Sequence, residues 1–127
     1  MENYMKAILS VYDKTGVVAL GKKLSNSGME IISTGGTFKQ LSEAKIEVTA
    51  VQELTEFPEI LDGRVKTLHP KIYGGLLARR NNKNDIAQIS DHGISTIDLV
   101  AVNLYPFSDA ISNPDCTLDN ALENIDI

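Results

Sequence analysis

Residues 97–104 read IDLVAVNL, and their composition indicates the fold class. It is the most continuous apolar run in the chain, and Pro106 closes it because proline lacks the N–H that strand pairing requires. A strand that is apolar at nearly every position is typical of a parallel sheet covered by helices on both faces. We therefore expect residues 97–104 to form a central parallel strand.

Helical and extended segments alternate along the rest of the chain. Residues 16–27 place Val17, Leu20 and Leu24 on one helical face, and Gly28 ends that helix. Residues 55–73 are expected to be irregular, and residues 74–78 to form a strand or a tight turn. The other expected elements are strands at 7–11, 29–33 and 48–51, and helices running from the 34–37 segment through Ala44, at 84–92 and from Thr117 onward.

This alternation predicts an α/β, Rossmann-like fold with three layers, in which helices flank a mostly parallel sheet. The 127 residues suffice for one domain, spanning 1–127, with a modest core. Ligands of such sheets bind outside the carboxyl ends of the strands. The polar loops at 10–14, 34–37 and 103–105 each follow an expected strand, so we expect them to converge on one rim.

Composition excludes several classes of protein. The 12 Lys and Arg against 17 Asp and Glu give a net charge of −5, which argues against a nucleic-acid binder. No stretch is long and apolar enough for a signal peptide or a membrane span, so we expect a cytoplasmic protein. Cys116 is the only cysteine, and with His69 and His92 it matches no zinc-site spacing. No metal site is expected.

The segment 63–70, GRVKTLHP, is the strongest candidate for an anion site. Arg64 and Lys66 alternate around Val65, so both point the same way from an extended backbone, with the Thr67 hydroxyl beside them. Two converging cations suit a phosphate or a carboxylate. A solvated basic loop is the alternative. His69 before Pro70 is either catalytic or holds a turn.

The segment 34–37, TGGT, is a second candidate. Gly35 and Gly36 allow a sharp turn with exposed N–H groups, Thr34 and Thr37 add hydroxyls, and a helix N-terminus adds partial positive charge. An ordinary tight turn is the alternative, since the segment is neither a P-loop nor a dinucleotide fingerprint.

Residues 10–14 contribute Ser10, Asp13 and Lys14 ahead of the first helix. A cap on that helix would be a sufficient structural role for Asp13. Lys14 opposes the helix dipole there, so it either meets a bound anion or extends into solvent. At the end of the long apolar run, Asn103 can donate and accept at the rim. Tyr105 either takes part in hydrogen bonding or proton transfer, or covers the core.

Four motifs taken together resemble one family. The motifs SVYDKTG at 10–16, STGGT at 33–37, the run 53–79 and NLYPF at 103–107 occur in this order in the N-terminal IMP cyclohydrolase domain of the bifunctional purine biosynthesis enzymes. The resemblance covers essentially the whole chain. It implies a methylglyoxal-synthase-like fold and the closure of 5-formamidoimidazole-4-carboxamide ribotide to inosine monophosphate and water.

The resemblance also implies what accompanies the reaction. The substrate is a purine ribonucleotide, the step needs no metal or organic cofactor, and the full-length protein is a homodimer. A C-terminal formyltransferase domain that uses 10-formyltetrahydrofolate follows in the family, and this chain has no room for it. The family continues past Asp126 and Ile127 with a glycine pair and another catalytic lysine, so the chain resembles a truncated cyclohydrolase domain.

Carried over by position, the family's catalytic residues correspond to Lys66, Tyr105 and Asp126. Tyr12 stands where many members of that family have serine, so the resemblance implies an altered side chain at one nucleotide contact. The nucleotide-binding positions correspond to Ser10, Tyr12, Asp13, Lys14, Thr34, Gly35, Gly36, Thr37, Arg64, Val65, Lys66, Thr67, Val102, Asn103, Asp126 and Ile127.

Two other functions are compatible with such a fold. One is a phosphate-eliminating lyase like methylglyoxal synthase. The catalytic Asp within a Gly-Pro-rich loop that is expected in methylglyoxal synthases is not found in this sequence. The other is a module that senses a nucleotide or phosphate without turning it over. The set Lys66, Tyr105 and Asp126 favours the cyclohydrolase, because a sensor does not need it.

Overall fold

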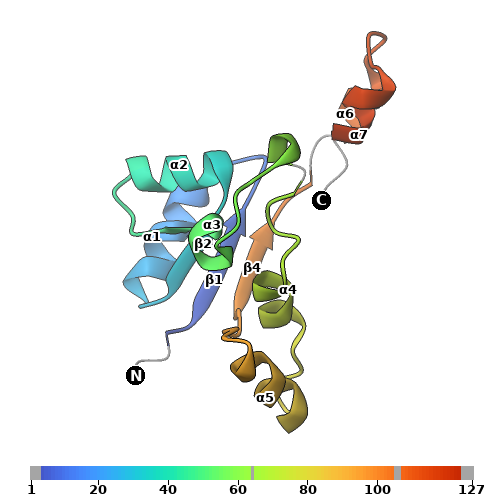
Figure 1. The fold of residues 1–127 in the computed structure, drawn as a ribbon. Coiled ribbons are helices and arrows are strands. Elements are labelled where there is room, and N and C mark those ends of the chain that lie inside the picture. Colours follow the sequence, from blue (N-terminus) through green and yellow to red (C-terminus); the bar gives the residue numbers. More distant parts are fainter. Residues whose placement is uncertain (1–3, 64, 105–106, 124–127) are drawn as a thin grey trace.

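The sheet is parallel, as the sequence predicts. The computed structural model describes residues 4–63, 65–104 and 107–123, without the side chains of 107, 122 and 123. Within these residues the strands are β1 (Lys6–Ser10), β2 (Glu30–Ser33), β3 (Thr49–Ala50) and β4 (Leu99–Val102). Every pairing is parallel and the order is β3-β2-β1-β4 (Figure 1).

One face of the sheet is covered by α1 (Val17–Asn26) and α2 (Gly35–Glu43). Successive residues of a strand point to opposite faces, and Leu9 of β1 belongs to the apolar cluster on this side. The cluster joins both helices to the sheet through Leu9, Val17, Ile31, Leu41 and Ile46.

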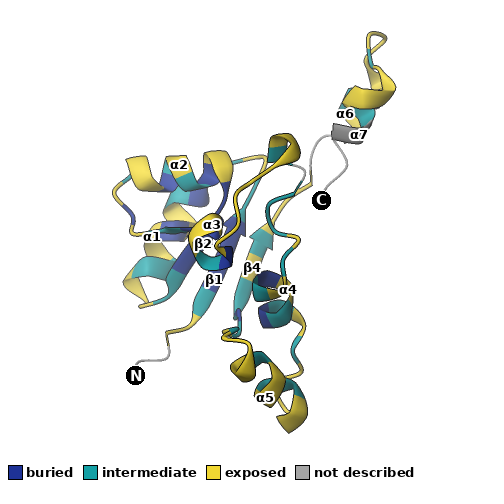
Figure 2. Cartoon of the chain, viewed as in Figure 1, coloured by how far each residue is buried: buried dark blue, intermediate teal, exposed yellow. Residues whose placement is uncertain are grey.

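The opposite face is covered by α3 (Val51–Thr55) and α4 (Pro70–Leu77). Ile8, the neighbour of Leu9 in β1, packs here with Ile32, Val51, Ile72 and Ile97. The two clusters lie on the two faces of one sheet, so the predicted three-layer arrangement is confirmed. Figure 2 shows β1 and β2 as mostly buried strands, with exposed residues on α1 and α2.

The expectation that residues 97–104 form a central strand is wrong. Only Leu99–Val102 are extended as β4, and β4 lies at one edge of the sheet among the described residues, whereas β1 lies inside it. The run is apolar on both faces because one face packs against helices and the other lines the cavity described below. Leu99 and Ala101 pack on the α1/α2 side, while Val100 and Val102 are 50% and 57% exposed.

The expected strand or turn at 74–78 is also wrong, because residues 74–77 continue helix α4 and Ala78 is its C-cap. Pro70 occupies the first turn of the helix, where its missing N–H costs nothing. His69 is the N-cap, and its Nδ1 accepts a hydrogen bond of 3.1 Å from the Lys71 N–H. His69 therefore holds the start of a helix, which is the structural one of the two roles that the sequence left open.

Gly74 and Gly75 suit this helix because they allow it to pack closely. A Cβ on Gly75 would collide with the backbone oxygen of Ser95, and one on Gly74 would lie 3.1 Å from the Ile94 side chain. The glycine pair therefore reflects the close approach of α4 to the segment before β4, and that approach is invisible in local sequence.

The remaining boundaries differ modestly from the sequence expectations. The strand expected at 48–51 is limited to β3, because Val51 already starts α3. The other elements are the short 3-10 helix η1 (Leu61–Gly63), α5 (Lys83–Asp91), α6 (Phe107–Ser112) and α7 (Leu118–Glu123), of which α6 was not expected. Figure 1 shows α6 and α7 beyond the carboxyl end of β4, where they pack on each other.

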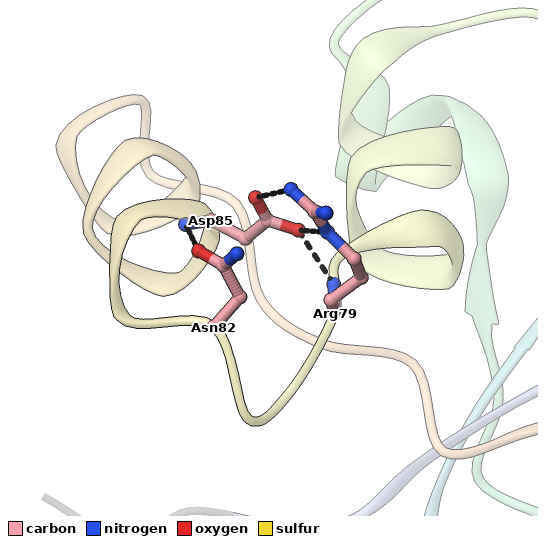
Figure 3. A network of polar contacts seen from close by, with 3 residues as sticks. All are labelled: Arg79, Asn82 and Asp85. Carbon is pink, nitrogen blue, oxygen red and sulfur yellow. Dashed lines mark hydrogen bonds and ion pairs between the residues drawn. The ribbon is translucent and has the colours of Figure 1, made fainter.

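A polar network fixes the start of α5 (Figure 3). The Asn82 side chain caps the helix by accepting from the Asp85 N–H at 3.0 Å. The Arg79 guanidinium donates to both carboxylate oxygens of Asp85, at 2.8 and 2.9 Å. These hydrogen bonds lower the pKa of Asp85 to about 2. The network connects α4 to α5 and lies on residues that do not line the cavity described below.

Candidate functional site

A cavity of about 260 Å³ opens at the carboxyl ends of β1, β2 and β4, on the face that α4 covers. The loops after three strands do converge there, as the sequence predicts, and the 63–70 segment joins them through Lys66 and Thr67. The cavity is lined by Ile8, Ser10, Val11, Tyr12, Lys14, Thr34, Gly35, Gly36, Thr37, Lys66, Thr67, Ile72, Tyr73, Leu76, Val100, Val102 and Asn103.

The N-terminus of α2 faces this cavity. The expected loop at 34–37 is in fact the first turn of the helix, with Thr34 as an extended N-cap and Gly35 at a φ of +45°. No side chain caps the helix. The N–H groups of a first helical turn have no partner within the helix and carry partial positive charge, so they suit an anion.

Lys14 lies directly beside this helix start. Its Nζ donates to the carbonyl oxygens of Val11 at 3.0 Å and Tyr12 at 3.2 Å. A Cβ on Gly36 would lie 3.1 Å from Lys14 Cε and 3.5 Å from Nζ. Lys14 therefore does not extend into solvent. Two neutral carbonyls thus hold the Lys14 ammonium beside the helix N-terminus, and within the described residues its hydrogen bonds go to no carboxylate.

The hydroxyl groups near the cavity hold the loops together. Ser10 Oγ and Thr34 Oγ1 are 2.8 Å apart and share a hydrogen bond. Thr37 Oγ1 donates to the Val11 carbonyl and accepts from the Val11 N–H, each at 3.1 Å. Thr34 and Thr37 are 4% and 2% exposed, so their hydroxyls connect β1 to the β2–α2 junction.

Asn103 fastens the β1–α1 loop to the end of β4. Its Oδ1 accepts from the N–H groups of Tyr12 at 2.7 Å and Asp13 at 3.1 Å, and its Nδ2 donates to the Asp13 carbonyl at 2.8 Å. Both acceptor positions of Oδ1 are thus used, and one N–H of Nδ2 makes no hydrogen bond to the residues that the structure describes. Asn103 positions the backbone that in turn holds Lys14, a role that the sequence did not indicate.

Asp13 does not take the capping role on α1 that the sequence allows. Gly16 is the N-cap, at a φ of +78° and without a side-chain hydrogen bond. Asp13 Oδ1 instead accepts from the Thr15 N–H at 3.0 Å, and hydrogen bonding to Thr15, with a contribution from the Lys14 charge, lowers the pKa of Asp13. The carboxylate thus closes a tight turn from Asp13 to Thr15, and this turn ends before Gly16, the N-cap of α1.

The 63–70 segment supplies Lys66 and Thr67 to the cavity, whereas Val65 pairs with Ile60 in an isolated antiparallel bridge. Val102 contributes a half-exposed apolar side chain. The predicted site residues Arg64, Tyr105, Asp126 and Ile127 lie outside the described residues.

Sequence reasoning missed the apolar side of the cavity. Ile72, Tyr73 and Leu76 come from α4, and Ile8 and Val100 come from neighbouring positions of β1 and β4. Pro70 could have indicated the α4 residues, because proline is common at the first position of a helix. A helix that starts there places Ile72 and Leu76, four residues apart, on one face.

Neither a metal cluster nor a membrane-spanning helix is found in the described part of the chain. No group of three or more His, Cys, Asp or Glu side chains in it is arranged to hold a metal ion. None of its helices has the length and apolar character needed to cross a membrane.

A family model matches most of the chain. The model described as "MGS-like domain" matches residues 16–127. The match includes α1, the start of α2, the 63–70 segment and β4.

Curated relatives match over nearly the whole chain. The bifunctional purine biosynthesis protein PurH of Bacillus subtilis is 57% identical over 122 residues, which cover 96% of this chain and 24% of that protein. PurH of Oceanobacillus iheyensis is 55% identical over the same shares, and PurH of Neisseria meningitidis serogroup C is 54% identical over 100% of this chain and 24% of its own length. The chain thus spans about a quarter of the length of these relatives.

A solved structure agrees with the fold. The crystal structure of ForH superposes with a TM-score of 0.85 at 34% identity, covering 98% of this chain and 62% of that one. The architecture described above is therefore shared with an experimentally determined protein.

Proposed function

This chain belongs to the MGS-like domain family, and from that premise we propose that it is an IMP cyclohydrolase domain. The reaction is the closure of 5-formamidoimidazole-4-carboxamide ribotide to inosine monophosphate and water. The proposal draws support from the identity of 54% to 57% with three PurH proteins and from the chemistry of the cavity.

The observation that carries the proposal is that Lys14, the α2 N-terminus and Lys66 line the same cavity. In a protein of net charge −5, this is a local concentration of positive charge. A nucleotide monophosphate presents a phosphate together with a base that undergoes chemistry. The cavity offers a separate cation for each.

The 5′-phosphate is proposed to bind at the start of α2. The uncapped first turn offers N–H groups from Gly35 and Gly36, and the Lys14 ammonium lies beside Gly36. Charge-assisted hydrogen bonds of this kind are stronger than neutral ones, and backbone donors lose little entropy because the helix already orders them.

Ring closure requires contact between two groups of the same substrate. The carboxamide nitrogen attacks the formyl carbon, and a C–N bond forms. One hydrogen from each of the two nitrogens leaves with the formyl oxygen as water, and a C=N bond remains. An amide nitrogen is a weak nucleophile because its lone pair is delocalised, so holding the groups in contact and stabilising the oxyanion are the main tasks of the protein.

Lys66 is proposed to stabilise the charge that develops on the formyl oxygen. Arg64 and Thr67 are proposed to orient the base or the ribose, and Tyr105 and Asp126 to relay protons or orient the carboxamide. Arg64, Tyr105 and Asp126 enter through the family resemblance, since they lie outside the described residues.

The function of the longer relatives is a separate proposal. We expect the parent protein to carry formyltransferase activity dependent on 10-formyltetrahydrofolate, to act as a cytoplasmic homodimer, and to use no metal or organic cofactor in the cyclohydrolase step. The chain covers only about a quarter of such proteins, so these properties call for tests on the full-length protein.

The test is the ultraviolet absorbance change when the chain meets the formamido ribotide, run with Lys66→Ala and with Lys39→Ala as a control. Lys39 is an exposed residue of α2 that does not line the cavity. Loss of an oxyanion donor lowers kcat by roughly 100-fold, so we expect that loss for Lys66→Ala, with the Kd for inosine monophosphate changed by less than about threefold.

A chain extended by the residues that follow in the relatives is run in parallel. Turnover by the extended chain alone would place the activity in the longer protein. Binding of inosine monophosphate by both chains without turnover would support the sensing module instead. If neither chain binds or turns over nucleotide while folded, the cyclohydrolase proposal is wrong.

A further inference from the structure

The inner part of the cavity is apolar, and the proposed chemistry gives its side chains no role. Ser10 pairs with Val102 at the ends of their strands, and Ile8 pairs with Val100 two residues earlier on the same face. Two residues of a strand span roughly 7 Å. The cavity therefore runs from a polar mouth at the strand ends down an apolar sheet surface.

Helix α4 borders this apolar surface. Its Ile72 and Leu76 belong to the core cluster that packs on the sheet. Tyr73, between them in sequence, belongs to neither apolar cluster, is 39% exposed and lines the cavity. Tyr73 is thus an aromatic side chain that the core does not use.

The position of Tyr73 is rigidly supported. The helix start is capped by His69, Ile72 is 2% exposed, and Gly75 lies too close to the Ser95 backbone to admit a Cβ. Tyr12, the other aromatic residue among the described lining residues, lies on a loop. A side chain on an anchored helix loses little conformational entropy when a ligand packs on it.

We infer that Tyr73 is a specificity-determining residue that packs its ring against the heterocyclic base of the bound nucleotide, opposite the apolar surface of Val100 and Val102. This inference rests on the proposed function, since it names the part of the same cavity that recognises the base. A flat, weakly polar ring fits an apolar slot, and stacking on an aromatic side chain contributes to binding whatever the pattern of hydrogen bonds. The phosphate is recognised separately, at the start of α2.

The experiment compares two probes by calorimetry: inosine monophosphate, and ribose 5-phosphate, which lacks the base. Tyr73→Leu is expected to raise the Kd for inosine monophosphate by about fivefold or more. The Kd for ribose 5-phosphate should change by less than about twofold. If ribose 5-phosphate binds too weakly for direct titration, its Kd is measured by competition. Tyr73→Phe keeps the ring and should bind both probes like the unmodified chain.

Tyr4→Leu is the matched control. Tyr4 is 56% exposed, precedes β1 at the opposite end of the strand and does not line this cavity, so the same substitution there should change neither Kd. Thermal unfolding of each variant reports whether the fold is intact.

The outcomes separate the inference from the function it rests on. Equal weakening of both probes by Tyr73→Leu, or no weakening of either, would overturn the base-stacking role while leaving nucleotide binding established. A loss in Tyr73→Phe as large as that in Tyr73→Leu would assign the contact to the hydroxyl and also overturn stacking. If the unmodified chain binds neither probe, the proposed function fails, and this inference fails with it.

Discussion

Lys14 shows how a single side chain can acquire a role that its sequence position contradicts. A cation ahead of a helix is unfavourable in isolation because it opposes the dipole. Here the carbonyls of Val11 and Tyr12 hold the ammonium, and it lies beside the start of α2 and not only of α1. The two helix N-termini and the lysine together make a positive region for which an anion is the natural complement.

A substitution at Gly36 separates binding from stability. A Cβ there would lie 3.1 Å from Lys14 Cε, so Gly36→Ala must push the lysine side chain by a few tenths of an ångström. Alanine is also favoured over glycine within a helix by up to about 1 kcal/mol. We expect unchanged or increased stability by urea unfolding, together with roughly three- to tenfold weaker binding of inosine monophosphate.

Lys14→Met supplies the control for that prediction. If Gly36→Ala acts through Lys14, it should add little to the loss already seen in Lys14→Met, because residues that share a contact are not additive. Fully additive losses would show that the alanine disturbs the N–H groups of the helix directly.

At the scale of elements, α4 is where local sequence and structure disagree most. The pattern Gly74-Gly75-Leu76-Leu77-Ala78 indicates extended structure or a turn, since glycine weakens helices. The cap by His69, Pro70 in the first turn and the burial of Ile72 outweigh that cost. Tertiary packing thus selects the helix and requires the glycines.

Gly75→Ala tests this account. Its Cβ would collide with the Ser95 backbone oxygen and lie 3.0 Å from the Ile97 side chain, so backbone must shift. Overpacking of this kind costs about 1–3 kcal/mol, more than the helix propensity of alanine restores. Gly74→Ala should cost less in the same urea measurement, because its neighbours are Ile94 and Ile89 side-chain atoms that can move. Equal costs would argue against a backbone contact at Gly75.

Strand β4 illustrates the same point for the sheet. Its sequence indicates burial on both faces, but the described sheet places it at an edge. The α4-side face of β4 is half exposed because it forms the wall of the cavity. An apolar sequence pattern does not distinguish a side chain that a helix covers from one that lines a cavity.

At the scale of the whole molecule, Asp98 connects distant parts of the chain at the end of the sheet opposite the cavity. Its Oδ2 accepts from the Lys6 N–H at 2.7 Å, and its Oδ1 pairs with Arg80 at 2.5 Å. Arg80 also donates to the Ile97 carbonyl at 2.6 Å. Partial burial opposes ionisation, but the hydrogen bonds from Arg80 and Lys6 outweigh it and lower the pKa of Asp98.

Asp98→Asn is expected to destabilise the fold by about 1–2 kcal/mol at neutral pH, since it weakens hydrogen bonds to a charged acceptor whose side chain is only 12% exposed. A lowered folded-state pKa means that the carboxylate stabilises the fold above its ordinary value of 3.8, and that this contribution is lost as pH falls through the folded-state pKa. The gap between the two proteins should therefore shrink below about pH 4. A gap that stays constant in urea unfolding from pH 7 to pH 3 would contradict a role for the charge.

The fold class, the parallel sheet and the rim on which the loops meet can be predicted from the sequence alone, because apolar periodicity and glycine or proline punctuation are local properties. It also indicated Lys14, Lys66 and the Thr34 to Thr37 segment as members of one site. Four other features emerge only from three-dimensional packing: residues 74–77 are helical, β4 lies at an edge of the described sheet, Asn103 and Thr37 hold loops, and Tyr73 lines the cavity. Each of these depends on contacts between residues far apart in the chain, and local sequence carries no record of such contacts.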